Sequence, residues 1–359
     1  MKRLLFTALL LFVLCTPVFA EELPLDVSAV ETGLGEDERA ISGSLQTDGG
    51  YDMEGAISRL YKRAKGEIID RVRDELRELS GLVAIACLCT AAESLTPDQR
   101  CSELISLCAC SAVTLTVAGS VDSLAGEMIA SIARLNDYGR AALPAVFSAA
   151  AVSGAVVSAG AKYAAVCLSL NIMMEVLQRV TIPLIYAYLA LAISRRVFPN
   201  GVLDAAVSTV KWVAVTAMTV LTMGISAYIG LTGALTGPAD AAAVKGTKTL
   251  IAGVLPVVGG ILSDAASVVL SSAAVIKNSA GVFALIGVCA LCLSPFAAIG
   301  VKMLAFKLCA AVASALEGRR LSGLLSDLSA ALGMMLGVLG SVTIMLFISF
   351  MAAIRTVSA

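Results

Sequence analysis

Polar and helix-breaking residues interrupt one of the most apolar parts of the chain, at 254–281. Proline removes a backbone hydrogen bond and adjacent glycines lower helix propensity, so this stretch predicts a kink or a break in a helix. Backbone groups freed at membrane depth must be buried in protein or face a water-filled cavity. The candidate cavity or helix-break residues are Pro256, Gly259, Gly260, Asp264, Lys277 and Asn278.

Asp264 is the most demanding of these residues, because a carboxylate at the centre of a bilayer costs about 2.5–3.5 kcal/mol on insertion scales. Lys277 cannot pair with it within one straight helix, since their spacing corresponds to on the order of 20 Å. Two interpretations stay open: a segment that lines a pore or cavity, and a helix whose two polar ends mark the membrane surfaces. Lys162, Asn171 and Glu175 raise the same question earlier in the chain.

The residue types leave little room for enzymatic chemistry. The 359 residues contain no histidine, which excludes Ser-His-Asp and Cys-His catalysis and His-containing metal sites. The apolar stretches contain no Gly-x-Ser-x-Gly motif and no paired catalytic aspartates. We therefore expect no enzyme, and we assign no catalytic, metal-binding or cofactor-binding residues.

Ten cysteines include two close pairs, Cys87 with Cys89 and Cys108 with Cys110. Such pairs on neighbouring helices could hold a metal ion or form disulfides. All of them lie in apolar helical stretches, where cysteine behaves as a small hydrophobic residue. Packing is the favoured interpretation, and metal or redox chemistry is the alternative.

The composition predicts the fold class. Hydrophobic residues make up 58% of the chain, charged residues 15%, and the mean hydropathy is +0.90. This balance is typical of an all-α, polytopic integral membrane protein, and no basic face of the kind that binds nucleic acid is present. We expect about six to eight transmembrane helices, with a broken or re-entrant helix near 254–264. The apolar stretches are 80–96, 102–121, 140–161, 163–193, 204–233, 248–276, 281–316 and 328–354.

Residues 1–20 predict a secretory signal peptide. Lys2 and Arg3 precede an apolar run, and a small-x-small pattern ends at Ala20. An uncleaved first membrane helix is the alternative. A lipoprotein anchored through Cys15 is disfavoured, because the preceding Leu14 is too bulky for that cleavage. Cleavage would place the next residues outside the cytoplasmic membrane.

Two segments separate the signal peptide from the membrane domain. Residues 21–50 are acidic and aperiodic, so we expect a flexible extracytoplasmic arm. Residues 51–80 predict a charged amphipathic helix that could lie on the membrane, pack on a partner or cap the protein's own membrane domain. Its apolar stripe comprises Ile57, Leu60, Tyr61, Ala64, Ile68, Val72, Leu76 and Leu79.

The helical membrane domain, 81–359, shows a weak sign of duplication. Leu143-Pro144 and Pro183 are matched at one constant offset by Leu255-Pro256 and Pro295. This spacing predicts tandem repeats at 140–237 and 252–354, a plan common among transport proteins. The basic pairs at 195–196 and 319–320, and Lys245 with Lys248, are candidates for cytoplasmic loops. Small residues predicted to pack helices closely are Gly154, Ser329, Gly333, Gly337 and Ser341.

The segment LPVVGGILSDAASVVLSSAAVIKNSAG resembles the stage III sporulation protein AE family of endospore-forming bacteria. Its Pro256, Gly259, Gly260, Asp264, Lys277 and Asn278 follow the order of the family. The run at 143–154 and the sequence IPLIY at 182–186 also fit, and the resemblance covers about residues 80–354.

This resemblance implies a membrane component of the channel-like, secretion-like complex that joins mother cell and forespore and supports late forespore development. The implied location is the mother-cell-derived outer forespore membrane. The implied partners belong largely to the same stage III sporulation A operon: a cytoplasmic ATPase, ring proteins of the intermembrane space, and a membrane protein on the forespore side. The family implies no catalytic residues.

The residues themselves leave two further functions open. One is a secondary transporter or permease for a small solute or ion, coupled through Asp264, Glu175 or Lys162. The other is a structural anchor whose helix at 54–79 recruits extracytoplasmic partners. Contact with membrane lipid is expected in every case, and the small-residue ridges are also compatible with a homo-oligomer.

Overall fold

The computed structural model describes residues 34–42, 53–95, 99–152, 156–198, 200–254, 259–316 and 318–354, without the side chains of 233–279. These residues are entirely helical apart from short turns, as the composition predicts. The elements are α3 (Glu36–Ser42), α4 (Met53–Leu95), α5 (Gln99–Val152), α6 (Val156–Val176), the π-helical turn η1 (Leu177–Thr181), α7 (Ile182–Val197), α8 (Gly201–Val254), α9 (Gly259–Ala315) and α10 (Arg319–Ile354).

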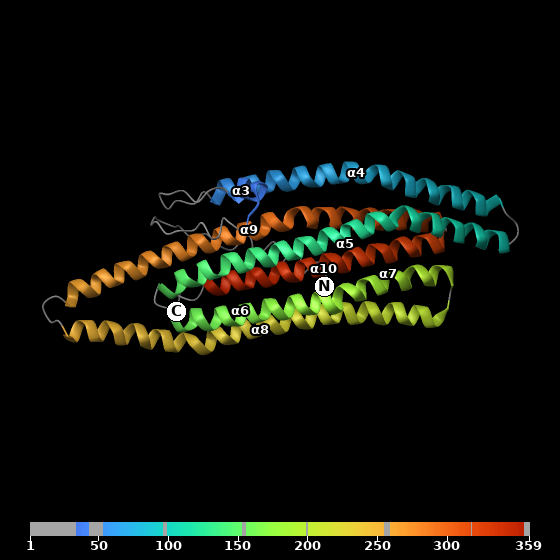
Figure 1. The fold of residues 1–359 in the computed structure, drawn as a ribbon. Helices are drawn as coiled ribbons and strands as arrows, with labels where there is room; N and C mark the ends of the chain where they lie inside the picture. The colour runs from blue at the N-terminus through green and yellow to red at the C-terminus, as the bar shows by residue number, and fades with distance from the viewer. Residues whose placement is uncertain are drawn as a thin grey trace.

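The long helices lie side by side in an elongated bundle (Figure 1). Helices α9 and α10 pack against each other along their length, and α5 packs on both. Helix α4 runs along the outer side of α9 and α5, whereas α6, α7 and α8 cover the other side of α10. One layer therefore contains α4, α5 and α6–α7, and the other contains α9, α10 and α8.

The core of the bundle follows from the apolar sequence. Large side chains without measurable exposure come from several helices, including Tyr138 of α5, Phe283 and Phe306 of α9, and Phe350 of α10. The Tyr138 hydroxyl donates a hydrogen bond to the carbonyl of Ala284 (3.2 Å), which satisfies its polar end inside the core. Helices α9 and α10 form the centre because they are apolar on nearly every face.

Five helical segments in the described part of the chain are long and apolar enough to cross a membrane: Arg100–Ser148, Ala159–Val197, Gly201–Ile229, Ala280–Ala315 and Arg319–Ile354. The sequence predicted six to eight. Two predicted apolar stretches, 102–121 and most of 140–161, join into one continuous helix in α5, and the predicted stretch 248–276 lies outside the residues described with side chains. The 54 residues of α5 correspond to about 80 Å of helix. A hydrocarbon core is about 30 Å thick, so α5 extends well beyond it.

The prolines occupy different local structures. Pro183 is the second residue of α7, and α7 directly follows η1. Proline lacks an N–H group and crowds the carbonyl four residues earlier, and a π-helical turn relieves this crowding. Pro144 and Pro295 lie inside the continuous helices α5 and α9. Pro256 lies outside the described residues, so the tandem repeat stays a prediction.

The predicted helix interruption near 254–264 coincides with a reversal of the chain. Helix α8 ends at Val254 and α9 begins at Gly259, and the two run in opposite directions (Figure 1). From Gly259 onward the helix is continuous to Ala315. Asp264, Lys277 and Asn278 therefore belong to one unbroken helix.

Part of the segment predicted as a flexible arm is packed. Helix α3 contacts α9 and α4, and Leu34 just before it is buried. A Cβ atom at Gly287 of α9 would lie 3.3 Å from Leu34, so this glycine leaves room for the contact. Asp37 of α3 also pairs with Arg63 of α4 at 3.2 Å. An aperiodic sequence gave no sign of these long-range contacts.

Candidate functional site

The candidate residues of the helix break lie at the end of the bundle where α8 meets α9. Gly259 and Gly260 form the first turn of α9, and Asp264 follows in the next. The side chains of Asp264, Lys277 and Asn278 lie outside the described ones, as does Pro256. A cavity-facing role for these residues thus stays a prediction.

The small residues of α10 lie against two helices. The Ser329 hydroxyl donates to the carbonyl of Met303 in α9 (3.0 Å), and a Cβ atom at Gly333 would lie 3.4 Å from the sulfur of Met303. One turn further, Gly337 faces Met218 of α8. Ser341 donates within α10 to the carbonyl of Gly337 (2.9 Å). Gly154 lies outside the described residues.

Lys162, Asn171 and Glu175 do not form one site. Lys162 is buried and donates to the carbonyl of Ala352 in the last turn of α10 (3.4 Å). The helix dipole stabilises a cation at this C-terminal position. The other two side chains are exposed. Asn171 accepts from Arg140 of α5 (2.9 Å), and Glu175 pairs with Arg179 (2.6 Å). A converging solute site is therefore absent from these three residues.

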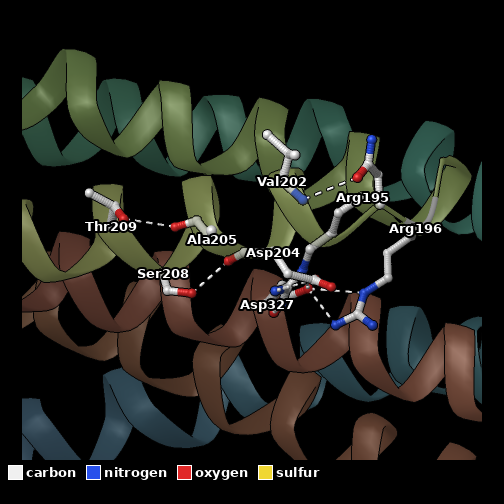
Figure 2. Close-up of polar contacts among 9 residues, drawn as sticks. Arg195, Arg196, Val202, Asp204, Ala205, Ser208, Thr209 and Asp327 are labelled. Atoms are coloured by element: carbon white, nitrogen blue, oxygen red, sulfur yellow. Dashed lines mark hydrogen bonds and ion pairs between the residues drawn. The ribbon is translucent and has the colours of Figure 1, made fainter.

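Asp327 forms the first of two charged clusters that sequence reasoning missed (Figure 2). Its side chain is 9% exposed and accepts hydrogen bonds from two successive arginines at the end of α7. Arg196 donates through Nη2 at 2.7 Å and through Nε at 3.1 Å. Arg195 donates through Nε at 3.2 Å and also through Nη2. One carboxylate thus holds two guanidinium groups.

Local structure positions the remaining members of this cluster. Asn200 caps α8 by accepting from the N–H of Val202 (3.1 Å), which places Asp204 in the first turn. Asp204 lies 3.4 Å from Nη1 of Arg195, so the cluster is neutral overall. A Cβ atom at Gly323 of α10 would collide with the guanidinium of Arg196. The Asp327 cluster therefore joins α7, α8 and α10 at one end of the bundle.

Lys302 of α9 forms the centre of the second cluster. Its side chain is 4% exposed, and its Nζ lies 2.9 Å from Oε1 of Glu75 and also pairs with Glu78. Both glutamates belong to α4. Ser120 of α5 donates to Glu78 (3.3 Å), and the Phe306 ring lies 5.4 Å from Nζ. Burial raises the pKa of Glu75 above its ordinary value, although Lys302 opposes the shift.

The polar contact of α4 with α9 and α5 continues one to two turns along α4. Ser294 of α9 donates to Glu67 (3.0 Å), and Arg71 pairs with Glu67 (3.4 Å). Arg71 also lies 3.5 Å from Glu127 of α5. Helix α4 therefore caps the protein's own membrane domain, one of the three expected arrangements, and it does so partly with charged residues.

The predicted apolar stripe of α4 lies mostly on the outside. Leu60, Ala64 and Leu79 are half-buried. The remaining five are exposed: Ile57, Tyr61, Ile68, Val72 and Leu76. The stripe and the inner charged face are adjacent on the helix, so periodicity alone could not show which would contact α9. The sequence feature that identifies the charged face of α4 as the inner one is Lys302, the basic residue in the middle of an apolar stretch.

These clusters offer ion pairing and hydrogen bonding rather than a reacting group. Among the described residues no set of three or more Cys, Asp or Glu side chains is arranged to hold a metal ion. No disulfide joins any of the nine cysteines in the described part of the chain, and Cys89, Cys110, Cys292 and Cys309 are buried in the bundle. These four cysteines pack inside the bundle, whereas Cys87, Cys101 and Cys108 are exposed.

Comparison with known proteins relates the chain to one family. The family described as Stage III sporulation protein AE matches residues 39–357. No curated protein matches the chain. No solved structure matches it either. The match covers most of the chain and includes the segment with Pro256, Asp264 and Lys277. The chain therefore belongs to the stage III sporulation protein AE family, as a membrane protein of sporulation stage III with several candidate spans.

Proposed function

We propose that the protein is a membrane component of the channel-like complex that links mother cell and forespore and is required for late forespore development. We place it in the outer forespore membrane, derived from the mother cell. The observation that carries this proposal is the family match over residues 39–357. The five candidate spans are compatible with it.

The proposed partners are the other proteins of the stage III sporulation A operon, with a membrane protein on the forespore side. They include a cytoplasmic ATPase and ring proteins of the intermembrane space. The shape of the bundle supports partners on both sides of the membrane. Helices α5 and α8 each contain 54 residues, or about 80 Å, and so extend beyond a hydrocarbon core of about 30 Å.

We further propose that the protein is not an enzyme. Its charged clusters contain only groups that pair with one another, and the chain has no histidine for proton transfer. The alternative of an autonomous transporter needs polar groups that converge near mid-membrane. Lys162 and Glu175 instead have separate partners in different places. The conduit component is therefore the function we favour.

The test is purification of a tagged full-length chain in gentle detergent from sporulating cells, followed by identification of the proteins that accompany it. Recovery of the ATPase and the ring proteins is the expected result. A second multi-pass membrane protein from the same cells, tagged in the same way, is the control. Recovery of the chain alone, as a clean monomer or homo-oligomer, would contradict membership of the complex and favour the transporter.

A further inference from the structure

The bundle has a long side without charged residues. The segment 212–232 of α8 contains no Asp, Glu, Lys or Arg, and the same holds for 281–301 of α9 and 328–354 of α10. Each segment is long enough to cross a hydrocarbon core. On the outside of this side, α8 exposes Val220 and Met223 among other apolar residues.

These three segments lie level with one another along the bundle. Cys292 of α9 has its sulfur 3.0 Å from the hydroxyl of Thr343 in α10. A Cβ atom at Gly337 of α10 would lie 3.9 Å from Met218 of α8. The uncharged parts of α8, α9 and α10 therefore form one continuous apolar belt on this side.

The opposite side carries charges at the same level. A Cβ atom at Gly139 of α5 would collide with Leu346 in the middle of the uncharged part of α10. The next residue, Arg140, is exposed and bonded to Asn171 of α6. We define the charged face by six exposed residues of α4, α5, α6 and η1: Arg73, Arg134, Asp137, Arg140, Glu175 and Arg179.

The α4 part of this face is level with the belt as well. Glu67 of α4 bonds to Ser294, which lies within the uncharged segment of α9. Arg71 reaches Glu127 of α5. The exposed charges of α4 that surround these contacts, such as Arg73, are therefore not displaced toward one end of the bundle.

Exposed charges level with the belt would contact lipid if lipid surrounded the bundle. Placing the membrane at another level along the bundle does not avoid such contacts. Toward the end of the bundle where α4 ends and α5 begins, the neighbouring parts of these two helices are apolar, at 82–92 and 104–121. At that level, however, Arg320 lies 3.9 Å from Glu103 of α5, which is 59% exposed, and Asp204 of the Asp327 cluster is 68% exposed. No single level is therefore free of charge on every side of the described bundle, and lipid cannot surround it.

We propose that the charged face lines a water-filled passage, which this protein encloses together with other chains, and that hydrated, polar solutes pass along it. The proposal rests on the function proposed above and names the surface that would serve it. Lipid would then contact the α8 side alone.

Water fits the charged face better than a dry protein contact does. The side chains of Arg179 and Glu175 are 77% and 59% exposed and pair with each other along the surface. Arg140 likewise bonds to its neighbour Asn171. Charged residues are depleted in the cores of protein interfaces, because burying them there removes hydration without adding partners. Intramembrane charges that are not buried characteristically face a water-filled cavity.

The first test measures the reaction of single cysteines with a membrane-impermeant, cationic methanethiosulfonate. The ten native cysteines are replaced, and the full-length chain is kept in native membranes of sporulating cells. We expect Asp137→Cys and Arg134→Cys to react at least about tenfold faster than Val220→Cys and Met223→Cys, since only a hydrated thiol ionises and reacts readily. Equal, slow reaction at all four positions would overturn the passage. Slow reaction at 137 that accelerates when detergent dissociates the complex would overturn it too, by indicating a dry protein contact.

A second test keeps the native cysteines and introduces one charge on each side of the bundle. Ala133 of α5 and Ala227 of α8 are both exposed. Ala133→Lys is expected to leave membrane insertion and spore yield within about twofold of the wild type, and Ala227→Lys to lower both by about tenfold or more. Equal loss in both variants would contradict the proposal. If the partners are recovered in the purification above but position 137 is not labelled, the passage is contradicted, whereas membership of the complex is supported.

Discussion

At the scale of single residues, Asp327 neutralises two arginines that would otherwise repel each other. The three side chains are largely buried, so their charges are weakly screened by water. Removing one member of a buried group leaves the others without compensation. The arrangement also needs Gly323, because only a residue without a side chain leaves room for the guanidinium of Arg196.

We predict that Asp327→Asn lowers the free energy of unfolding by about 3 kcal/mol, because two part-buried guanidinium groups lose their shared carboxylate. Asp204→Asn is the matched control. That side chain is 68% exposed, and an exposed ion pair contributes only about 0.2–1 kcal/mol. Denaturant unfolding in mild detergent measures both. Equal effects of the two substitutions would contradict the central role of Asp327.

Gly323→Ala should destabilise the protein by about 1–3 kcal/mol, because the added methyl group must displace Arg196 from its carboxylate. The control is Gly224→Ala in α8, where nothing lies near the added atom. Alanine is a better helix former than glycine, so this control should be neutral or slightly stabilising. Unfolding midpoints of the two variants provide the comparison, and the prediction fails if Gly323→Ala is also neutral.

At the scale of helices, α4 contacts the bundle through a face that contains acidic residues. Lys302 lies between Glu75 and Glu78, so one buried cation serves two carboxylates. Burial raises the pKa of Glu75 above its ordinary value, because the loss of hydration penalises the charged form more than Lys302 stabilises it. The apolar stripe of α4 lies mostly on the outside, where it contributes little to the contact with α9 and α5.

Glu75 gives a pH dependence whose sign follows from its raised pKa. A folded-state pKa above the unfolded value means that the folded state binds more protons, so α4 attachment is stronger at acidic pH and weakens as pH rises through the folded pKa. Glu75→Gln should remove this dependence and leave attachment at neutral pH equal or stronger, since Lys302 keeps Glu78. Hydrogen exchange of α4 amides, measured from pH 4 to 8, tests the prediction.

Lys302→Met is the companion variant, because it leaves both carboxylates without a cation. We expect faster hydrogen exchange along α4, with Lys307→Met on the exposed side of α9 as the control. Unchanged exchange in Lys302→Met would show that the apolar contacts of α4 suffice without the ion pairs.

The exposed stripe of α4 predicts a second contrast. Ile68→Ser and Val72→Ser should change the free energy of unfolding by less than about 1 kcal/mol, because both side chains are exposed. Leu82→Ala, at a buried position of the same helix, should destabilise by about 2–5 kcal/mol. Denaturant unfolding in mild detergent measures the change in free energy for each variant. A large loss in the stripe variants would show that the stripe packs on the bundle after all.

At the scale of the whole molecule, the turns of the bundle divide between its two ends. The α7–α8 and α9–α10 turns lie at the same end (Figure 1). The basic residues at 195–196 and 319–320 accompany these two turns. Lys245 and Lys248 lie in the part of α8 that approaches the opposite end, so the three basic candidates do not mark one side. By the positive-inside rule, the arginines at the α7–α8 and α9–α10 turns predict that this end of the bundle is cytoplasmic.

This arrangement predicts that positions 200 and 318 lie on the cytoplasmic side. In the background without native cysteines, Asn200→Cys and Gly318→Cys should react with an impermeant maleimide only after the mother-cell membrane is opened. Labelling of the two positions from opposite sides would contradict the shared end of the two turns. Gly224→Cys, in the middle of α8, serves as a control that should resist labelling from both sides.

The sequence by itself determined the class of the protein. Long runs of Ala, Leu and Val leave helices as the only way to satisfy backbone groups in lipid, and the spacing around Pro256 and Asp264 was sufficient to relate the chain to its family. Only the tertiary structure decided which charges meet. Asp327 with Arg195, and Lys302 with Glu75, are far apart in the chain. Their pairing depends on how long helices are aligned, which local periodicity does not encode, and the same alignment brings the exposed charges of α5, α6 and η1 level with the uncharged parts of α8, α9 and α10.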